Sequence, residues 1–120
     1  MRYLILLLFS FSLLSCNREL PTDKEVSQAP KNLLTKEVFT NLYYDSQLTE
    51  AAVRNEIAKG TNTKDISTYL YRELFDKYGI TEEDFKDNIR YYASDPELMQ
   101  EIQTEVVNRL TKKEAELTNQ

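Results

Sequence analysis

Apolar residues recur at helical spacing in four successive stretches of this chain, with polar residues between them. Side chains three or four residues apart lie on one face of an α-helix, so each stretch predicts an amphipathic helix. We expect helices over residues 36–58, from about 65 to 78, from 82 to about 92 and from 96 to about 111. The expected core positions are Val38, Leu42, Thr49, Ala52, Val53, Ile66, Leu70, Leu74, Tyr78, Phe85, Ile89, Tyr92, Leu98, Ile102, Val106 and Leu110.

Capping residues mark the ends of the first and last helices. Thr35 is a good N-cap for the first helix, and Thr40 is expected on its polar face. Lys59 and Gly60 supply a cation and a stop at its end. Either Ser94 or Asp95 can cap the last helix, whose charged end from residue 112 onward is expected to fray.

The turn between the second and third helices carries the clearest local signal. Gly79 stands where a left-handed cap residue belongs, so Ile80 is expected to pack back on Phe75 in a Schellman motif. Thr81 then caps the third helix, with Asp84 in the reciprocal position of a capping box. With only 2 Gly and 3 Pro in the chain, the pattern predicts an all-α fold, a small bundle of about four helices.

A short apolar leader precedes this domain. Arg2 supplies a positive charge, residues 4–14 are apolar apart from two serines, and small Ser15 comes directly before Cys16, the one cysteine. This is the layout of a secretory signal, and the run is shorter than the roughly 20 residues that span a membrane. With Leu13 three residues before the cysteine, the site resembles a bacterial lipobox.

The lipobox implies that residues 1–15 are a lipoprotein signal peptide and that Cys16 is lipidated with acyl chains such as palmitate. Two or more acyl chains anchor a protein stably to a membrane. The alternative is an ordinary secreted protein, which would carry a reactive free thiol. Residues 16–33 are expected to be the lipidated cysteine and a flexible tether, and residues 34–118 the helical domain. Asn17, rather than Asp, after the cysteine favours the outer membrane.

Composition excludes several classes of function. The chain has 15 Lys and Arg against 20 Asp and Glu, a formal charge of −5, which argues against nucleic acid as a partner. It contains no His, so histidine-based catalytic centres are excluded, and the sequence has no glycine-rich phosphate loop or calcium loop. We therefore expect no cofactor, no metal and no enzymatic activity.

Carboxylates and tyrosines remain as candidate binding residues. Asp45 falls on the apolar stripe of the first helix, so it needs either a structural hydrogen bond from another helix or a ligand. Glu50 has the spacing of a surface ion pair with Arg54 and does not share a face with Asp45. Tyr44 and Tyr91 each belong to a tyrosine pair, and each can face a protein or glycan partner or lie against its own bundle.

Several sequence pieces together resemble a known family. These are Leu42-Tyr43-Tyr44-Asp45, Leu48-Thr49-Glu50-Ala51-Ala52, Lys77-Tyr78-Gly79-Ile80-Thr81 and Tyr91-Tyr92 followed by Pro96-Glu97. In this order and spacing they resemble DUF4296, a domain of unknown function found in small lipoproteins of the Bacteroidota. Members often carry His where Gln47 stands here. Surface-exported lipoproteins of that phylum tend to have an acidic cluster after the cysteine; Arg18 interrupts it here, which favours the periplasmic face.

The sequence therefore predicts an envelope protein held on the membrane through Cys16, which binds another envelope protein as a non-catalytic accessory subunit. The alternative is a binder or carrier of a small apolar or glycan ligand between the helices, with Asp45 at the wall of the cavity. An exposed, patchy apolar surface would favour the first function.

Overall fold

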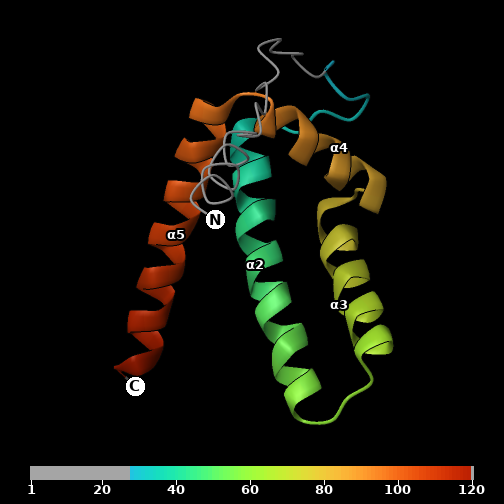
Figure 1. Cartoon of the computed structure of the whole chain (residues 1–120), viewed down its shortest axis with the longest axis vertical. Coiled ribbons are helices and arrows are strands. Elements are labelled where there is room, and N and C mark those ends of the chain that lie inside the picture. The colour runs from blue at the N-terminus through green and yellow to red at the C-terminus, as the bar shows by residue number, and fades with distance from the viewer. Residues whose placement is uncertain (1–27, 120) are drawn as a thin grey trace, which may run out of the picture.

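The computed structural model describes residues 28–119, which form four α-helices (Figure 1). The all-α prediction is confirmed. The predicted signal peptide, Cys16 and the tether up to residue 27 lie outside the described residues. None of the helices in the described part is both long enough and apolar enough to cross a membrane.

Helix α2 (Lys36–Ala58) is the middle helix of the domain. Helices α3 and α5 pack on its two sides, α3 antiparallel to it and α5 parallel to it (Figure 1). Thr35 caps α2 as predicted, with its hydroxyl accepting a hydrogen bond from the Val38 amide. The helix ends at Ala58, as predicted, before Gly60 at a φ of 91°.

The position of α2 between two helices explains two of the errors in its predicted core; Ala52, also expected in the core, is exposed. Thr40, expected on the polar face, is buried, while Val38, expected in the core, is one-third exposed. A helix packed on one neighbour buries one stripe, whereas α2 buries residues on two sides. The Thr40 hydroxyl tolerates burial because it donates to the Lys36 carbonyl at 2.8 Å.

Helix α3 (Thr63–Tyr78) begins two residues earlier than predicted. Asn62, within a stretch expected to be a loop, is its N-cap and accepts hydrogen bonds from the amides of Lys64 and Asp65. Asn is as good a cap as Asp because both side chains present an oxygen to the free amides of the first turn. Leu74 and Phe75 are the buried residues of this helix.

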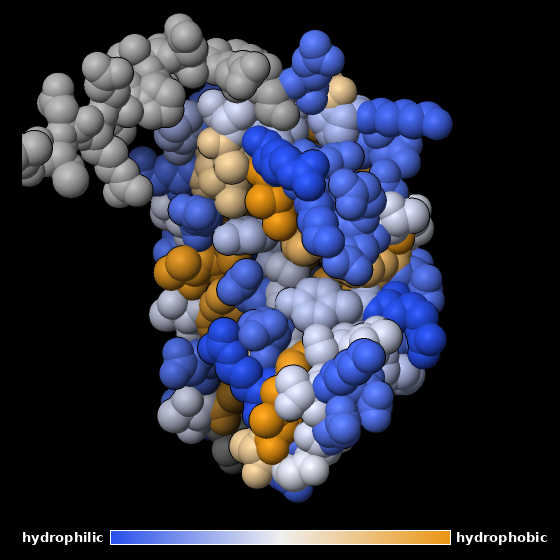
Figure 2. All heavy atoms as spheres, turned by 45° about the vertical axis from the view of Figure 1, so that its right-hand side comes forward, coloured by the Kyte–Doolittle hydropathy of each residue, from blue (hydrophilic) through white to orange (hydrophobic). Residues whose placement is uncertain are grey.

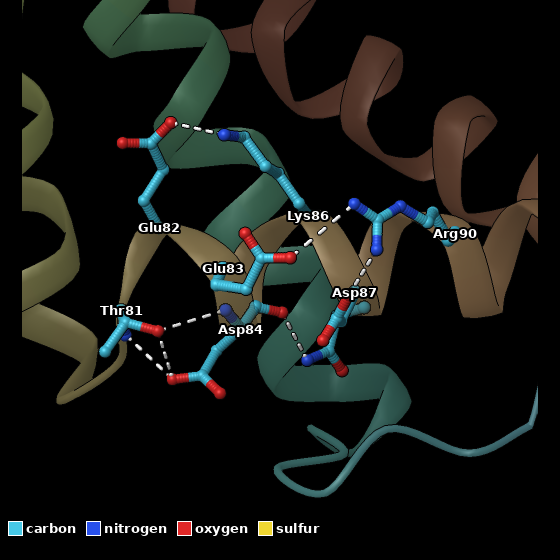
Figure 3. Close-up of polar contacts among 8 residues, drawn as sticks. Thr81, Glu82, Glu83, Asp84, Lys86, Asp87 and Arg90 are labelled. Atoms are coloured by element: carbon cyan, nitrogen blue, oxygen red, sulfur yellow. Dashed lines mark hydrogen bonds and ion pairs between the residues drawn. The ribbon is translucent and has the colours of Figure 1, made fainter.

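The predicted turn between α3 and α4 (Glu82–Ala93) is confirmed. Gly79 has a φ of 63°, and the Ile80 amide donates to the Phe75 carbonyl at 3.1 Å, which is the long hydrogen bond of a Schellman motif. Thr81 and Asp84 form the capping box, with both reciprocal bonds present (Figure 3). Helix α4 therefore starts at a defined angle to α3.

Helix α5 (Pro96–Thr118) has Asp95 as its N-cap, and the Asp95 carboxylate accepts a hydrogen bond from the Leu98 amide. The sequence had left the N-cap open between Ser94 and Asp95. Asp95 takes this position, and Ser94 is the C-cap of α4. The helix continues to Thr118, beyond the point where fraying was expected, although every residue from 111 to 119 is exposed.

The core consists of two small clusters on either side of α2. The first contains Phe39, Tyr92 and Ile102 from α2, α4 and α5. The rings of Phe39 and Tyr92 stack with centroids 4.3 Å apart. The second cluster contains Leu42, Leu74 and Phe75 from α2 and α3. Helix α4 contributes to both clusters, since Phe85 packs on the second.

Candidate functional site

Asp45, in the middle of α2, is bonded to two residues at the end of α3. Its Oδ2 accepts hydrogen bonds from the Lys77 ammonium and the Tyr78 hydroxyl, each at 2.6 Å. Partial burial on its own would raise the pKa of Asp45, but the hydrogen bonds from Lys77 and Tyr78 outweigh it and hold that pKa below its ordinary value. Burial and the Asp45 carboxylate together raise the pKa of Tyr78.

Arg109 of α5 approaches the same region of α2 from the other side. Its Nη1 donates to Asn41 Oδ1 at 2.9 Å, and its guanidinium lies 4.3 Å from the centre of the Tyr44 ring. The charge of Arg109 also lowers the pKa of Asp45. We call this set the Asp45–Arg109 cluster; it consists of Asn41, Tyr44, Asp45, Lys77, Tyr78 and Arg109. It connects the three long helices at one level.

Glu50 is a second carboxylate that accepts from a tyrosine of α3. The Tyr71 hydroxyl donates to Glu50 Oε2 at 3.0 Å, and Arg54 forms the predicted ion pair with Glu50 at 3.4 Å. Burial, followed by the bond to Glu50, raises the pKa of Tyr71. Asp45 and Glu50 thus engage different tyrosines, seven residues apart on α3, and they are not a paired acid–base site.

The tyrosines predicted to be candidate binding residues both lie against the domain itself. Tyr44 is half-buried under Arg109. Tyr91 is half-buried in the first core cluster and meets Tyr92 edge to face, with centroids 5.4 Å apart. Of the four candidates, Tyr44 and Asp45 share one cluster, while Glu50 and Tyr91 lie elsewhere.

Asn88 is an important residue that the sequence analysis missed. It is fully buried on α4. Its Oδ1 accepts from the Leu34 amide at 2.8 Å, and its Nδ2 donates to the carbonyls of Asn32 and Asp84. The signal for it was present, because position 88 falls three residues after Phe85 and four before Tyr92, on the apolar face of α4.

Asn88 holds the segment before α2 against α4. The Tyr92 hydroxyl adds a bond to the Leu34 carbonyl at 2.6 Å, and the Asn32 side chain donates to Asp84. The tether was predicted to extend to residue 33, but Asn32 is already fixed to the domain. Asn32 and Leu34 are therefore attached to the helical domain by hydrogen bonds.

A groove of about 610 Å³ runs between α3 and α4. The rings of Phe75 and Phe85 lie 5.6 Å apart in it, and Tyr71 lies 5.9 Å from Phe75. Its lining also contains charged residues of both signs: Arg72, Asp76, Glu82 and Lys86. Figure 2 shows this side of the molecule, where hydrophobic residues surface in narrow strips between hydrophilic ones. The groove thus combines an apolar, aromatic floor with a charged rim.

On the outer surface of α4, beside this groove, the charged side chains form ion pairs with one another. Lys86 pairs with Glu82, and Arg90 pairs with Glu83 and Asp87 (Figure 3). Such exposed pairs contribute little to stability. Their effect is to leave this side of α4 without a concentrated charge.

Residues 28–119 contain no group of three or more carboxylate or thiol side chains placed to hold a metal ion. The carboxylate of Asp45 is bonded to Lys77 and Tyr78, and both bonds engage its Oδ2. These hydrogen bonds join α2 to α3.

The family comparison matches nearly the whole described domain. The model of DUF4296, a domain of unknown function, covers residues 30–116. The match includes the segment fixed by Asn88, all of α2, α3 and α4 and most of α5. No curated protein and no solved structure gives a significant match. Because the family model covers well over half of the chain, the protein belongs to the DUF4296 family.

Proposed function

We propose that this protein is a non-catalytic accessory subunit of the cell envelope, anchored by lipid on Cys16 at the periplasmic face of the outer membrane. The leader and the cysteine at its end support the anchor, as argued from the sequence. The protein acts by binding another envelope protein. The observation that carries this function is the aromatic groove between α3 and α4.

The groove fits a protein segment that presents an apolar side chain between two charges. An apolar or aromatic side chain would lie over Phe85 and Tyr71 on the floor of the groove, where buried area contributes most to binding. Arg72 and Asp76, one turn apart on the rim, have no ion-pair partner within residues 28–119. They are free to pair with an acid and a base of the partner, which would fix its orientation.

The alternative function, a carrier of a small apolar or glycan ligand, has weaker support. A carrier function requires a cavity that is lined by tyrosines and has Asp45 at its wall. Asp45 does not line the α3–α4 groove, and Tyr71 is the one tyrosine among the residues that do. We therefore favour a protein partner.

Photo-crosslinking in native membranes tests the docking surface. A photoreactive residue at Thr68, exposed beside the groove, should capture one envelope protein, whereas the same residue at Thr63, exposed on α3 but outside the groove, should not. Capture of the same protein from both positions, or from neither, would contradict docking in the groove.

A substitution provides the second test. Thr68→Arg places a large charged side chain over the aromatic floor without altering a core residue. The amount of partner that co-purifies with the protein from membranes should therefore fall about tenfold or more. Thr63→Arg is the matched control and should leave recovery unchanged. Both variants must show the wild-type helical circular dichroism.

The anchor is tested separately. We expect radioactive palmitate to label the wild-type protein and to be absent from Cys16→Ala, which should move from the membrane to the soluble fraction because it lacks acyl chains. Labelling that persists in Cys16→Ala would contradict lipidation at this residue.

A further inference from the structure

The junction of α2 and α5 contains a small pocket that the proposed function does not use. It has a volume of about 250 Å³. Its lining consists of one residue of α2 and four of α5: Tyr44, Arg109, Lys112, Lys113 and Glu116. In the view of Figure 1, α5 diverges from α2 toward its C-terminus.

Positive charge is concentrated in this pocket, although the chain as a whole is acidic. Three cationic side chains line it, against the single carboxylate of Glu116. Lys112 and Lys113 are exposed and have no ion-pair partner within residues 28–119. Two further carboxylates lie near Arg109 without lining the pocket: Asp45, which is already bonded to Lys77, and Glu105, which lies 3.9 Å from Arg109 Nη1.

The guanidinium at the pocket is held in place before any ligand arrives. Arg109 is fixed by its hydrogen bond to Asn41 and by the Tyr44 ring beneath it, and Glu105 lies 3.9 Å from its Nη1. One guanidinium nitrogen is committed to Asn41, which leaves other N–H groups of the fork for a ligand. A cation held in this way loses less entropy on binding than a free one.

We propose that this pocket binds a phosphate group. Arginine forks and lysine ammonium groups are the side chains that recognise phosphate, and a dianionic phosphoryl group matches the excess of two positive charges in the lining. A ligand with a single carboxylate would neutralise only one of these two charges. The phosphate can belong to a soluble phosphorylated compound or to a lipid headgroup, and the two sources are separable by experiment.

The test uses the full-length protein in a non-ionic detergent with inorganic phosphate as the probe. At constant ionic strength, the Arg109 Nε–H and Tyr44 amide signals should shift saturably with phosphate and not with chloride in nuclear magnetic resonance spectra. In Lys112→Gln/Lys113→Gln the affinity should fall about tenfold or more, because two charged donors are lost.

The matched control is Lys59→Gln/Lys64→Gln, which removes the same total charge from two exposed lysines outside the pocket. Its affinity for phosphate should equal that of the wild type. An equal loss in both double variants would show that only the overall charge matters and would overturn the proposal, as would a wild-type spectrum without saturable shifts.

Vesicles distinguish the two sources of phosphate. Sedimentation with phosphatidylcholine vesicles that contain phosphatidic acid, but not with pure phosphatidylcholine, and its loss in Lys112→Gln/Lys113→Gln, would assign a lipid headgroup. Saturable binding of inorganic phosphate without such sedimentation would assign a soluble phosphorylated compound. If neither probe binds in a way that depends on Lys112 and Lys113, the pocket is not a phosphate site.

Discussion

Single polar side chains connect separate elements of this domain. Asn88 connects the segment before α2 to α4, and Asp45 connects α2 to α3. Asn88 accepts one hydrogen bond and donates two, and Asp45 accepts two on its Oδ2. When one of these side chains is replaced, the groups that were bonded to it stay desolvated but lose their partner. Each of these residues should therefore be costly to replace.

We expect Asn88→Ala to reduce the free energy of unfolding by about 2–4 kcal/mol, because the Leu34 amide and the Asn32 carbonyl lose their partner and a cavity remains. Urea denaturation followed by circular dichroism measures this loss. Asn108→Ala, at an exposed site on α5, should change it by less than about 0.5 kcal/mol. Equal effects would mean that Asn88 is not a critical contact.

Asp45 should make the stability of the domain depend on pH. Its pKa is lowered from the ordinary value of 3.8 in the folded state, so its contribution is fully present above about pH 4. That contribution is lost as the pH falls through the lower folded-state pKa. The stability difference between wild type and Asp45→Asn should therefore be largest near neutral pH and shrink below pH 4. A difference that stays constant down to about pH 2 would contradict this assignment.

At the scale of the elements, turns rather than helix interiors set the angles between helices. The turn at Gly79 joins a Schellman motif directly to a capping box, so Ile80 packs on the α3 side while Thr81 caps α4. Helix α4 can then cross the end of α2 and contribute to both core clusters. A local change in the backbone at Gly79 should therefore affect the whole domain.

Gly79→Ala should destabilise the domain by about 1–2 kcal/mol, since a Cβ is unfavourable in the left-handed region and nothing lies within 4 Å of it to compensate or clash. Gly79→Asn should cost less, because Asn tolerates this conformation better. Thermal unfolding of the three proteins measures the order. The assignment of a backbone effect is wrong if Asn is as costly as Ala.

The whole molecule is an open layer of three long helices with α4 across one end (Figure 1). The segment before α2 is part of this domain, because Asn32 and Leu34 are bonded to α4. Any force or motion from an N-terminal anchor would therefore reach α4 as well as α2. Both the groove and the phosphate pocket lie where helices meet without closing a central core.

Truncation tests the role of this segment. A chain that begins at residue 28 should unfold cooperatively, whereas one that begins at Thr35 should lose about 2 kcal/mol or more, because Asn88 and Tyr92 lose buried hydrogen-bond partners. Urea denaturation of both chains gives the difference. Equal stabilities would show that residues 28–34 are only a linker.

The sequence by itself determined the four helices and most of their ends. Thr35, Gly79 and Thr81 act within one turn of the chain, and such local interactions can be recognised from residue type and spacing alone. It missed Asn62 as the cap of α3, and it left the cap of α5 open between Ser94 and Asp95. The sequence also placed Asp45 on the apolar stripe of its helix, where it needed either a hydrogen bond from another helix or a ligand, and the structure shows hydrogen bonds from α3. It identified the family from pieces in all four helices.

Only the tertiary structure decided which partners meet. No spacing in the sequence relates Asp45 to Tyr78, Tyr44 to Arg109 or Asn88 to Leu34, since these contacts depend on how α3, α4 and α5 pack around α2. The burial of Thr40 has the same origin, because a middle helix has two covered sides. Helical periodicity predicts that a side chain points inward, but the packing of distant elements determines what it meets there.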